Sequence, residues 1–354
     1  VIDSQSYGIA LRGESDTDSV TISKALTVNS ARTTGIYITG GSLTLNEDSV
    51  ANITSSISEA YGFNNTSATK SYDGVFVEGG SLYANGEFNV THTGIENDYL
   101  NDEYNSGNYT FLRHEIKSYA VRVTEKQGSL QQTNVFISKG TIINRKLLEE
   151  YDSQGGGGVY VSGGTVTLGS SESANNNELQ VTTEGDQLYN ETYHHVDPYQ
   201  ADGWKYYLSR TGGHAIEVQG GSLTVNSGTY TAAQGNGIFV RNTDSSAVSN
   251  QVTINGGFFY GYNTGYNLGE NGRRVGPGAS AGLYVMGHSL TVNINGGTFG
   301  NKGNVSNSAA SFFGTSGGKR AQVYIKGGNF YGSKSDVMSV FRYVDFVFNA
   351  SDTT

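Results

Sequence analysis

The chain has no cysteine and only two prolines among its 354 residues. The absence of cysteine excludes disulfides, thiolate metal sites and cysteine nucleophiles. Two prolines beside 50 glycines argue against a disordered Pro/Gly linker or a mucin-like stalk. We therefore expect a folded chain in which glycine serves recurring tight turns.

Positive charge is also scarce, because 22 Lys and Arg face 32 Asp and Glu and give a formal net charge of -10. Nucleic acids and anionic membranes need a basic surface, so we expect neither as a partner. No apolar run approaches the roughly 18 residues of a membrane span, which argues against membrane insertion.

The chain opens at Val1 without a basic and hydrophobic leader, which suggests a soluble chain that was processed or excised from a longer one. Abundant Asn, Ser, Thr, Gly and Tyr favour an extracellular or cell-surface location.

One phrase recurs along the chain. It reads Gly-Ile-Tyr-Ile-Thr-Gly-Gly-Ser-Leu-Thr-Leu-Asn at residues 35–46 and returns, with small edits, from residues 74, 158, 215 and 282. A short strand, a glycine turn and a second short strand cannot bury an apolar face alone, so copies must stack on one another. The phrase predicts one β-solenoid domain over residues 1–354.

Within the phrase, branched residues alternate with an outward residue, as Ile36 and Ile38 do around Tyr37. Period two places the branched pair in a core column and the middle residue on the surface. Exposed aromatic residues in that outward column could stack on sugar rings, and the alternative is that they stack on each other or lie beneath the long loops. The predicted outward column is Tyr37, Phe76, Arg122, Tyr160, Glu217, Phe239, Tyr284 and Tyr324.

Two kinds of corner are expected between the strands. The Gly-Gly pair supplies positive φ at the first corner. Asparagine tolerates the left-handed region and can form a side-chain ladder at the second, which the sequence places at Asn46, Asn85, Asn226 and Asn293. A second phrase, Ile-Asn/Lys-Gly-Gly at residues 254–257, 294–297 and 325–328, takes over this role toward the end of the chain.

These repeats resemble the right-handed parallel β-helix of the pectin-lyase-like superfamily. The Gly-Gly-Ser-Leu-Thr-Val-Asn stretch at residues 220–226 is especially similar to coils in large surface proteins of Gram-positive bacteria. The resemblance implies an all-β, right-handed parallel β-helix with long loop insertions, and contact with polysaccharide or adhesion. It is a signature of fold and carries no catalytic motif. A left-handed helix would show a strict hexapeptide period, and a propeller would need four strands per regular blade.

Three insertions interrupt the repeat, at about 94–117, 184–212 and 260–280. The second combines aromatic platforms with titratable groups, the mixture expected of a carbohydrate or partner site. The alternative is a loop that packs its own aromatic residues on the solenoid. Two adjacent histidines on a strand cannot both face one metal, so no zinc or iron site is expected. The candidate binding residues there are Tyr193, His194, His195, Asp197, Tyr199, Asp202, Trp204, Lys205, Tyr206 and Tyr207.

The third insertion brings aromatic residues together with paired arginines in an otherwise acidic chain. Paired guanidinium groups could receive a uronate carboxylate, and the alternative is a solvated turn. The candidates are Tyr262, Tyr266, Arg273 and Arg274.

The first insertion is acidic, and its Asp98, Asp102, Glu103 and Asn105 raise the question of calcium. They lack the order of residues found in known calcium loops, so an acidic loop surface is the preferred interpretation. No cofactor is otherwise expected.

No catalytic constellation is visible, because no acidic residue recurs at the register of the repeat and hydrolysis needs paired carboxyl groups. We therefore expect an extracellular, non-catalytic β-solenoid that binds glycan or a surface partner, as part of an adhesin. One alternative is a structural subunit of a filament or surface layer that self-associates through solenoid ends, with the apolar segment 337–354 capping the stack or joining a neighbour. Another is a polysaccharide lyase or hydrolase.

Overall fold

The computed structural model shows strands and tight turns throughout the part of the chain that it describes. The described residues are 2–4, 7–13, 15, 17–30, 34–56, 73–93, 118–128, 131–145, 157–172, 178–184, 193–195, 204–206, 213–233, 235–242, 250–261, 281–300, 309–332 and 337–349. Within these ranges no helix occurs, and 26 strands join in one sheet.

The strands of this sheet pair in parallel and form three ladders. Ladder A joins β2 (Ile9–Leu11), β5 (Ile36–Ile38), β8 (Val75–Glu78), β10 (Tyr119–Thr124), the first part of β12 (Gly157–Leu168), the first part of β16 (Ile216–Val225), β18 (Ile238–Asn242), β21 (Leu283–Gly287), β24 (Ala310–Gly314) and β27 (Met338–Val340). Ladder B joins β3 (Ser19–Ile22), β6 (Ser42–Leu45), the first parts of β9 (Ser81–Thr93) and β11 (Asn134–Arg145), the second parts of β12 and β16, β19 (Asn250–Ile254), β22 (Leu290–Ile294), β25 (Ala321–Ile325) and β28 (Val344–Phe348). Ladder C joins β1 (Ile2–Ser4), β4 (Ala25–Ser30), β7 (Val50–Ser56), the second parts of β9 and β11, β13 (Leu179–Glu184), β17 (Thr229–Ala232), β20 (Phe258–Gly261), β23 (Thr298–Phe299) and β26 (Asn329–Phe330).

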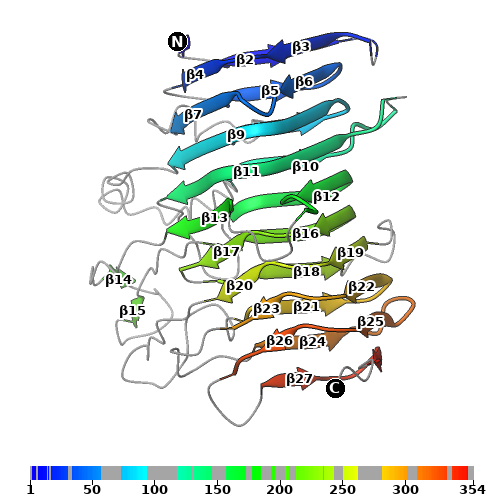
Figure 1. The fold of residues 1–354 in the computed structure, drawn as a ribbon. Coiled ribbons are helices and arrows are strands. Elements are labelled where there is room, and N and C mark those ends of the chain that lie inside the picture. The colour runs from blue at the N-terminus through cyan, green and yellow to red at the C-terminus, as the bar shows by residue number, and fades with distance from the viewer. Residues whose placement is uncertain are drawn as a thin grey trace.

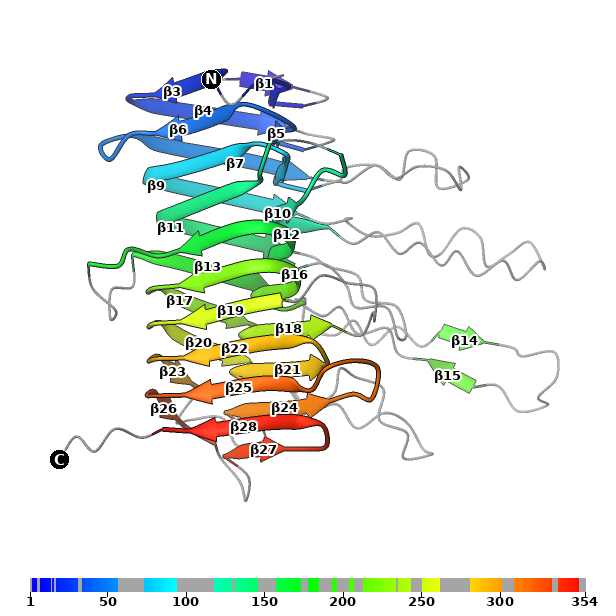
Figure 2. The same ribbon diagram turned by 90° about the vertical axis from the view of Figure 1, so that its right-hand side faces the viewer.

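The chain visits ladders C, A and B in turn, so that each circuit makes one coil. The coils stack in sequence order from the N-terminal strands to β27 and β28 (Figures 1 and 2). Each strand between the first and the last coil therefore pairs with the equivalent strand of the coil before it and of the coil after it. This is a parallel β-helix, and the predicted all-β solenoid is confirmed.

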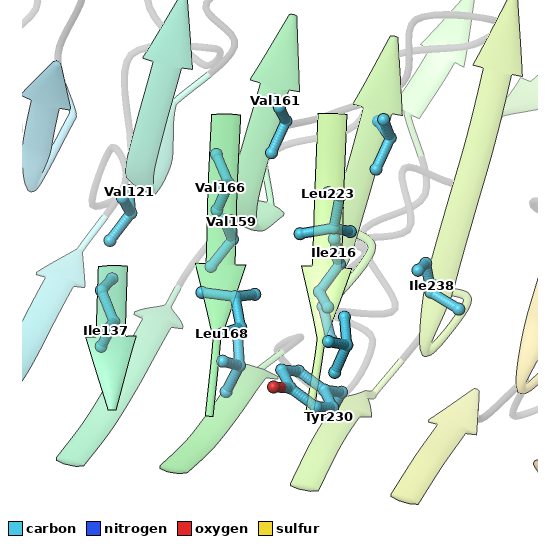
Figure 3. Packing of buried hydrophobic residues seen from close by; sticks show 14 of the residues in the cluster. Val121, Ile137, Val159, Val161, Val166, Leu168, Ile216, Leu223, Tyr230 and Ile238 are labelled. Atoms are coloured by element: carbon cyan, nitrogen blue, oxygen red, sulfur yellow. The ribbon is translucent and has the colours of Figure 1, made fainter. Parts of the chain in front are cut away.

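The core runs along the inside of the stack. Aliphatic side chains at the same position of neighbouring ladder A strands are aligned, as Val121, Val159, Ile216 and Ile238 show (Figure 3). All four are fully buried. Burying an aliphatic side chain of this size stabilises the folded chain by about 1.5–3 kcal/mol. The alternation of residues in the sequence therefore explains which side of each strand faces the core.

Aromatic side chains form a second inward column, in ladder C. The rings of Tyr230 and Phe259 are 5.1 Å apart, and Phe299 and Phe330 continue the stack at 5.0 and 4.9 Å. The Tyr230 hydroxyl donates a 2.7 Å hydrogen bond to the carbonyl of Ser227. Burial raises the pKa of Tyr230, so its phenol is neutral and remains a donor.

Glycine makes the corners between ladders. Gly41, between ladders A and B, has φ of 73°, and a Cβ there would lie 2.6 Å from the carbonyl oxygen of Asp18 in the previous coil. Gly257, in the second phrase, has φ of 100° and turns the chain from ladder B into ladder C. The predicted positive φ at the Gly-Gly pairs is confirmed at these positions, and close approach of the coils adds a second reason for glycine.

An asparagine ladder follows the ladder B strands. Asn255 Nδ2 donates to Asn226 Oδ1 at 2.9 Å, and Asn295 Nδ2 donates to Asn255 Oδ1 at 2.8 Å. The predicted ladder exists, but the choice of Asn293 for it was wrong. Asn293 lies within β22 at an outward position, and the corner residue is Asn295, because the strand extends to Ile294.

The assignment of Tyr324 to the outward column of ladder A was also wrong. Tyr324 lies in β25 of ladder B and pairs with Asn293. The ladder A position after Tyr284 belongs to Ser311. The aliphatic-aromatic-aliphatic pattern followed by Gly-Gly occurs in both ladders here, so the pattern alone cannot distinguish them.

Four strands at the end of the stack and beside it complete the fold. Strands β27 and β28 pair in parallel with β24 and β25, so the apolar segment predicted to cap or join the stack contributes strands to a last coil. Residues 350–354 of that segment lie outside the described residues. Strands β14 (Tyr193–His195) and β15 (Trp204–Tyr206) form a separate antiparallel sheet, drawn beside the stack in Figure 2.

Candidate functional site

The outward face of ladder A carries the predicted column in a continuous register. Neighbouring coils place Tyr37 beside Phe76, Phe76 beside Arg122, and Arg122 beside Tyr160. The column continues through Glu217, Phe239 and Tyr284. Strands aligned in this way set the residues of the column about 4.8 Å apart along the stack.

An aromatic rim (Tyr7, Tyr37 and Phe76) begins this face. The rings of Tyr7 and Tyr37 stack at 4.9 Å, and Phe76 follows at 5.3 Å. Tyr7 is exposed, and the other two are half-buried. Burial, with the charge of Glu78 adding to it, raises the pKa of Tyr37, so its hydroxyl stays protonated. The rim presents ring surface and phenolic donors to solvent.

A polar cluster, here called the central network (Asp73, Tyr119, Arg122, Tyr160, Glu217 and Gln219), occupies the middle of the face. Arg122 Nε lies 2.7 Å from Asp73 Oδ2, with Asp73 fully buried and Arg122 19% exposed. Asp73 Oδ1 also accepts a 2.8 Å hydrogen bond from the backbone N–H of Tyr119. The Asp73 carboxylate is therefore paired with a guanidinium and accepts a backbone hydrogen bond, which compensates its burial.

The other half of the central network surrounds Glu217, which is fully buried. The hydroxyl of Tyr119 donates to Glu217 Oε2 at 3.0 Å, and the side-chain amide of Gln219 donates to Oε1. Tyr160 stacks on Tyr119 at 4.5 Å, and the Arg122 guanidinium lies over both rings at 5.6 and 4.8 Å. Burial and the Glu217 carboxylate together raise the pKa of Tyr119 well above its ordinary value, so the phenol remains a donor.

A buried histidine adjoins the network on the C-terminal side. His214 Nδ1 accepts a 3.0 Å hydrogen bond from the backbone N–H of Asn236, which places the ring proton on Nε2. Asn236 Oδ1 accepts in turn from the backbone N–H of Ala281 at 2.7 Å. The ring of His214 packs on Phe239 at 4.5 Å. Burial, assisted by the charge of Arg241, lowers the pKa of His214 to about 3, so it is neutral at physiological pH.

Asp73, His214 and Asn236 share one position in the coil. Each lies two residues before the first aliphatic residue of a ladder A strand, and each accepts from the backbone N–H of the equivalent residue in the next coil. The prediction missed all three, together with Tyr119 at the same position. In the sequence, each of these four residues directly precedes a Gly or Ala, which is followed by the first aliphatic residue of a ladder A strand. This recurring position could have identified them.

The central network braces neighbouring coils and leaves no room for a substrate at its carboxylates. Two residues of the outward column are shielded from solvent, since Glu217 and Phe239 are 0% and 1% exposed. The ring of Phe239 stacks on that of the half-buried Tyr284 at 5.4 Å, as the rings of the rim stack on each other, so ring-on-ring stacking along the column is confirmed. A general acid and base need access to the bond they cleave, and Asp73 and Glu217 lack it.

Most long segments outside the described residues enter the coil at the edge of this face. Segments 57–72, 94–117, 146–156, 262–280 and 301–308 each connect a ladder C strand to the next ladder A strand, and the chain between β13 and β16 does the same. Segment 243–249, between ladders A and B, is an exception. The predicted insertions at 94–117, 184–212 and 260–280 all belong to this corner, although Tyr260 itself is part of β20.

The predicted binding residues fall into two groups. Strands β14 and β15 pair Tyr193 with Tyr206, His194 with Lys205, and His195 with Trp204. The remaining candidates lie outside the described residues, and so do the residues considered for calcium: Asp197, Tyr199, Asp202, Tyr207, Tyr262, Tyr266, Arg273, Arg274, Asp98, Asp102, Glu103 and Asn105.

Within the described part of the chain, no group of three or more histidine and acidic side chains is placed to hold a metal ion. In the same ranges no helix is long and apolar enough to cross a membrane. Comparison of the chain with protein families, with curated proteins and with solved structures finds no match.

Proposed function

We propose that the chain is an extracellular, non-catalytic binding β-helix that presents the ladder A face and its corner insertions to a glycan or another surface partner. An adhesin of the kind found on Gram-positive bacteria, which its coils resemble, is the proposed setting. The stacked coils provide a rigid arm, and the insertions provide specificity.

The aromatic rim is the observation that carries this proposal. It joins a stack of aromatic rings, of which Tyr7 is exposed, to phenolic donors, and the first long segment of the insertion corner, 57–72, enters the coil directly before β8, which carries Phe76. Aromatic side chains pack against the apolar faces of sugar rings while nearby polar groups fix the orientation of the sugar. The burial of Asp73 and Glu217 supports binding in preference to hydrolysis or elimination.

A glycan array tests the proposal with the full chain and two binding variants. One variant carries Tyr37→Ala and Phe76→Ala in the rim. The other carries Trp204→Ala, Tyr206→Ala and Tyr207→Ala in the second insertion. A matched control replaces Phe258 of ladder C and Tyr331, which directly follows β26, as Phe258→Ala and Tyr331→Ala, and thermal melting checks that all variants fold.

Binding by the wild type and the control, with loss in either binding variant, supports the proposal and identifies the part of the face that binds. Retention in both binding variants would remove the ladder A face from consideration. If the wild type bound neither a broad glycan array nor a panel of host surface proteins, the binding function would be rejected.

A structural subunit is the second candidate, and the last coil favours it. Phe341 and Phe348 are 54% and 61% exposed, and the edges of β27 and β28 are unpaired within the described residues. Open strand edges beside exposed apolar side chains promote pairing with another chain. Light scattering over a concentration series should then show assembly that Phe341→Glu with Phe348→Glu reduces. A strictly monomeric wild type would exclude this function for the chain.

A further inference from the structure

The outward face of ladder B, here called the neutral face, carries no charge from β3 to β25. Every outward position of these strands is Ser, Thr, Asn, Gln, Tyr or Phe. Charge returns only at the end of the stack, with Asp345 in β28. Charged residues make up 15% of the chain, and its net charge is -10. The absence of charge from the outward positions therefore distinguishes this face from the rest of the molecule.

Across the residues that the structure describes, the neutral face is accessible to solvent along its length. The outward side chains of ladder B are half-buried or exposed, and Tyr83 is 38% exposed. The ladder A face differs, because Glu217 and Phe239 in its middle are buried. Nothing in the described structure packs on the neutral face.

The register of ladder B arranges these side chains as a grid. Thr167 is aligned with Thr224 and Thr224 with Thr253, one coil after another. Parallel strands set such neighbours about 4.8 Å apart, and alternate residues along a strand are about 6.6 Å apart. The asparagine ladder Asn226–Asn255–Asn295 fixes the corner beside this grid. Hydroxyl and amide groups therefore repeat with constant spacing on a rigid flat surface.

The composition of the face discriminates between partners. Stable protein interfaces are enriched in Tyr, Trp, Phe, Met and Arg at a desolvated centre, and of the outward positions from β3 to β25 only Tyr83, Phe136 and Tyr324 are of these types. Nucleic acids need Lys and Arg to neutralise phosphates. A charged polysaccharide would lose hydration without gaining a counter-charge. A neutral partner rich in hydroxyl groups loses the least hydration free energy on binding and can form the most hydrogen bonds with this face.

An extended neutral polysaccharide has the matching chemistry. Its hydroxyl groups repeat along the chain and act as both donors and acceptors, as the Ser, Thr, Asn and Gln side chains do. Tyr83 and Phe136, aligned in adjacent coils, offer ring faces for the pyranose rings. We propose that the neutral face binds the flat surface of an insoluble, uncharged polysaccharide.

The neutral face is separate from the ladder A face, so the binding proposed for each face can be tested independently. The test measures depletion of the full chain from solution by microcrystalline cellulose and by chitin particles. The main variant removes hydroxyl groups from the grid with little change of shape, as Thr167→Val, Thr224→Val and Thr253→Val. A second variant places charge on the same face, as Thr44→Lys, Thr167→Lys and Thr253→Lys.

The matched control places the same charge on outward positions of ladder C, as Thr54→Lys, Thr182→Lys and Thr298→Lys. We expect the wild type and the control to be depleted by at least one of the particles. Both neutral-face variants should bind at least about 10-fold more weakly, because several hydrogen bonds to the ligand are lost at once.

Absence of wild-type binding to both particles would overturn the proposal, as would equal loss in the ladder C control. Retention by both neutral-face variants would also overturn it. The rim variants Tyr37→Ala and Phe76→Ala should leave depletion unchanged, and the neutral-face variants should leave any soluble glycan binding on the array unchanged. These two readouts separate failure of this proposal from failure of the ladder A function.

Discussion

The hydroxyl of Tyr119 donates a 3.0 Å hydrogen bond to Glu217, although 98 positions separate the two residues in the sequence. Stacking of the coils brings them together, with Tyr160 in the coil between. Because Glu217 is fully buried, the hydrogen bonds that it receives compensate its loss of water. The central network therefore contributes to the stability of the middle coils.

Replacement of Tyr119 by Phe should destabilise the protein by about 1–3 kcal/mol, because the Glu217 carboxylate loses one of its donors while it stays buried. Tyr324→Phe is the control, since Tyr324 is half-buried on the ladder B face and should tolerate loss of its hydroxyl. Urea denaturation followed by circular dichroism measures both. Equal midpoints for the two variants would show that the Tyr119 hydroxyl contributes little.

The ion pair of Arg122 with Asp73 should be strongly coupled. Arg122→Met should cost about 2–4 kcal/mol, somewhat below a fully buried pair because Arg122 keeps 19% of its side chain exposed. The exposed pair Arg320–Asp345 is the control, and Arg320→Met should cost about 0–1 kcal/mol. A double-mutant cycle with Asp73→Asn isolates the pair. A coupling energy near zero would contradict this account.

Acidification should destabilise the protein partly through His214. Its pKa is about 3 in the folded chain and near the ordinary 6.5 in the unfolded chain, so between these values only the unfolded chain binds the proton. The stability contributed by neutral His214 is therefore present above about pH 6.5 and declines as pH falls toward 3.

His214→Asn removes this titration while it keeps a side-chain acceptor for the backbone N–H of Asn236. The difference in unfolding free energy between wild type and His214→Asn should shift by about 2 kcal/mol in favour of the variant between about pH 7 and pH 5. Taking the difference cancels the carboxyl groups that titrate in both proteins. A difference independent of pH would refute the assignment.

Gly140 should not tolerate a side chain. Its φ is 122°, and a Cβ there would lie 2.2 Å from the carbonyl oxygen of Phe88 in the previous coil. We expect Gly140→Ala to cost at least about 3 kcal/mol, because backbone strain and a backbone clash add. Gly128 has φ of 76° but open space around it, so Gly128→Ala should cost only about 1–2 kcal/mol. Similar thermal midpoints for the two variants would contradict the role of coil contact.

The alternation at Ile36, Tyr37 and Ile38 was enough to predict strands, their inward faces and a stack of coils, because period two and glycine corners act within a few residues. The asparagine ladder was predicted in kind, since Asn226 occupies its expected corner. The error at Asn293 is a shift of two residues, because strand ends depend on contacts with the next coil. The candidate binding residues of the second insertion remain predictions apart from the pairing of β14 with β15.

Sequence alone determined that the chain is a parallel β-helix with aliphatic core columns, since local periodicity decides which side chains face inward. Only the tertiary structure decided that Tyr324 belongs to ladder B, that Asp73 and Glu217 are buried in one network, and that an uncharged face runs along the stack. The physical reason is that insertions of different length separate the coils in sequence. Which residues become neighbours therefore depends on how the coils align, and no short stretch of sequence contains that information.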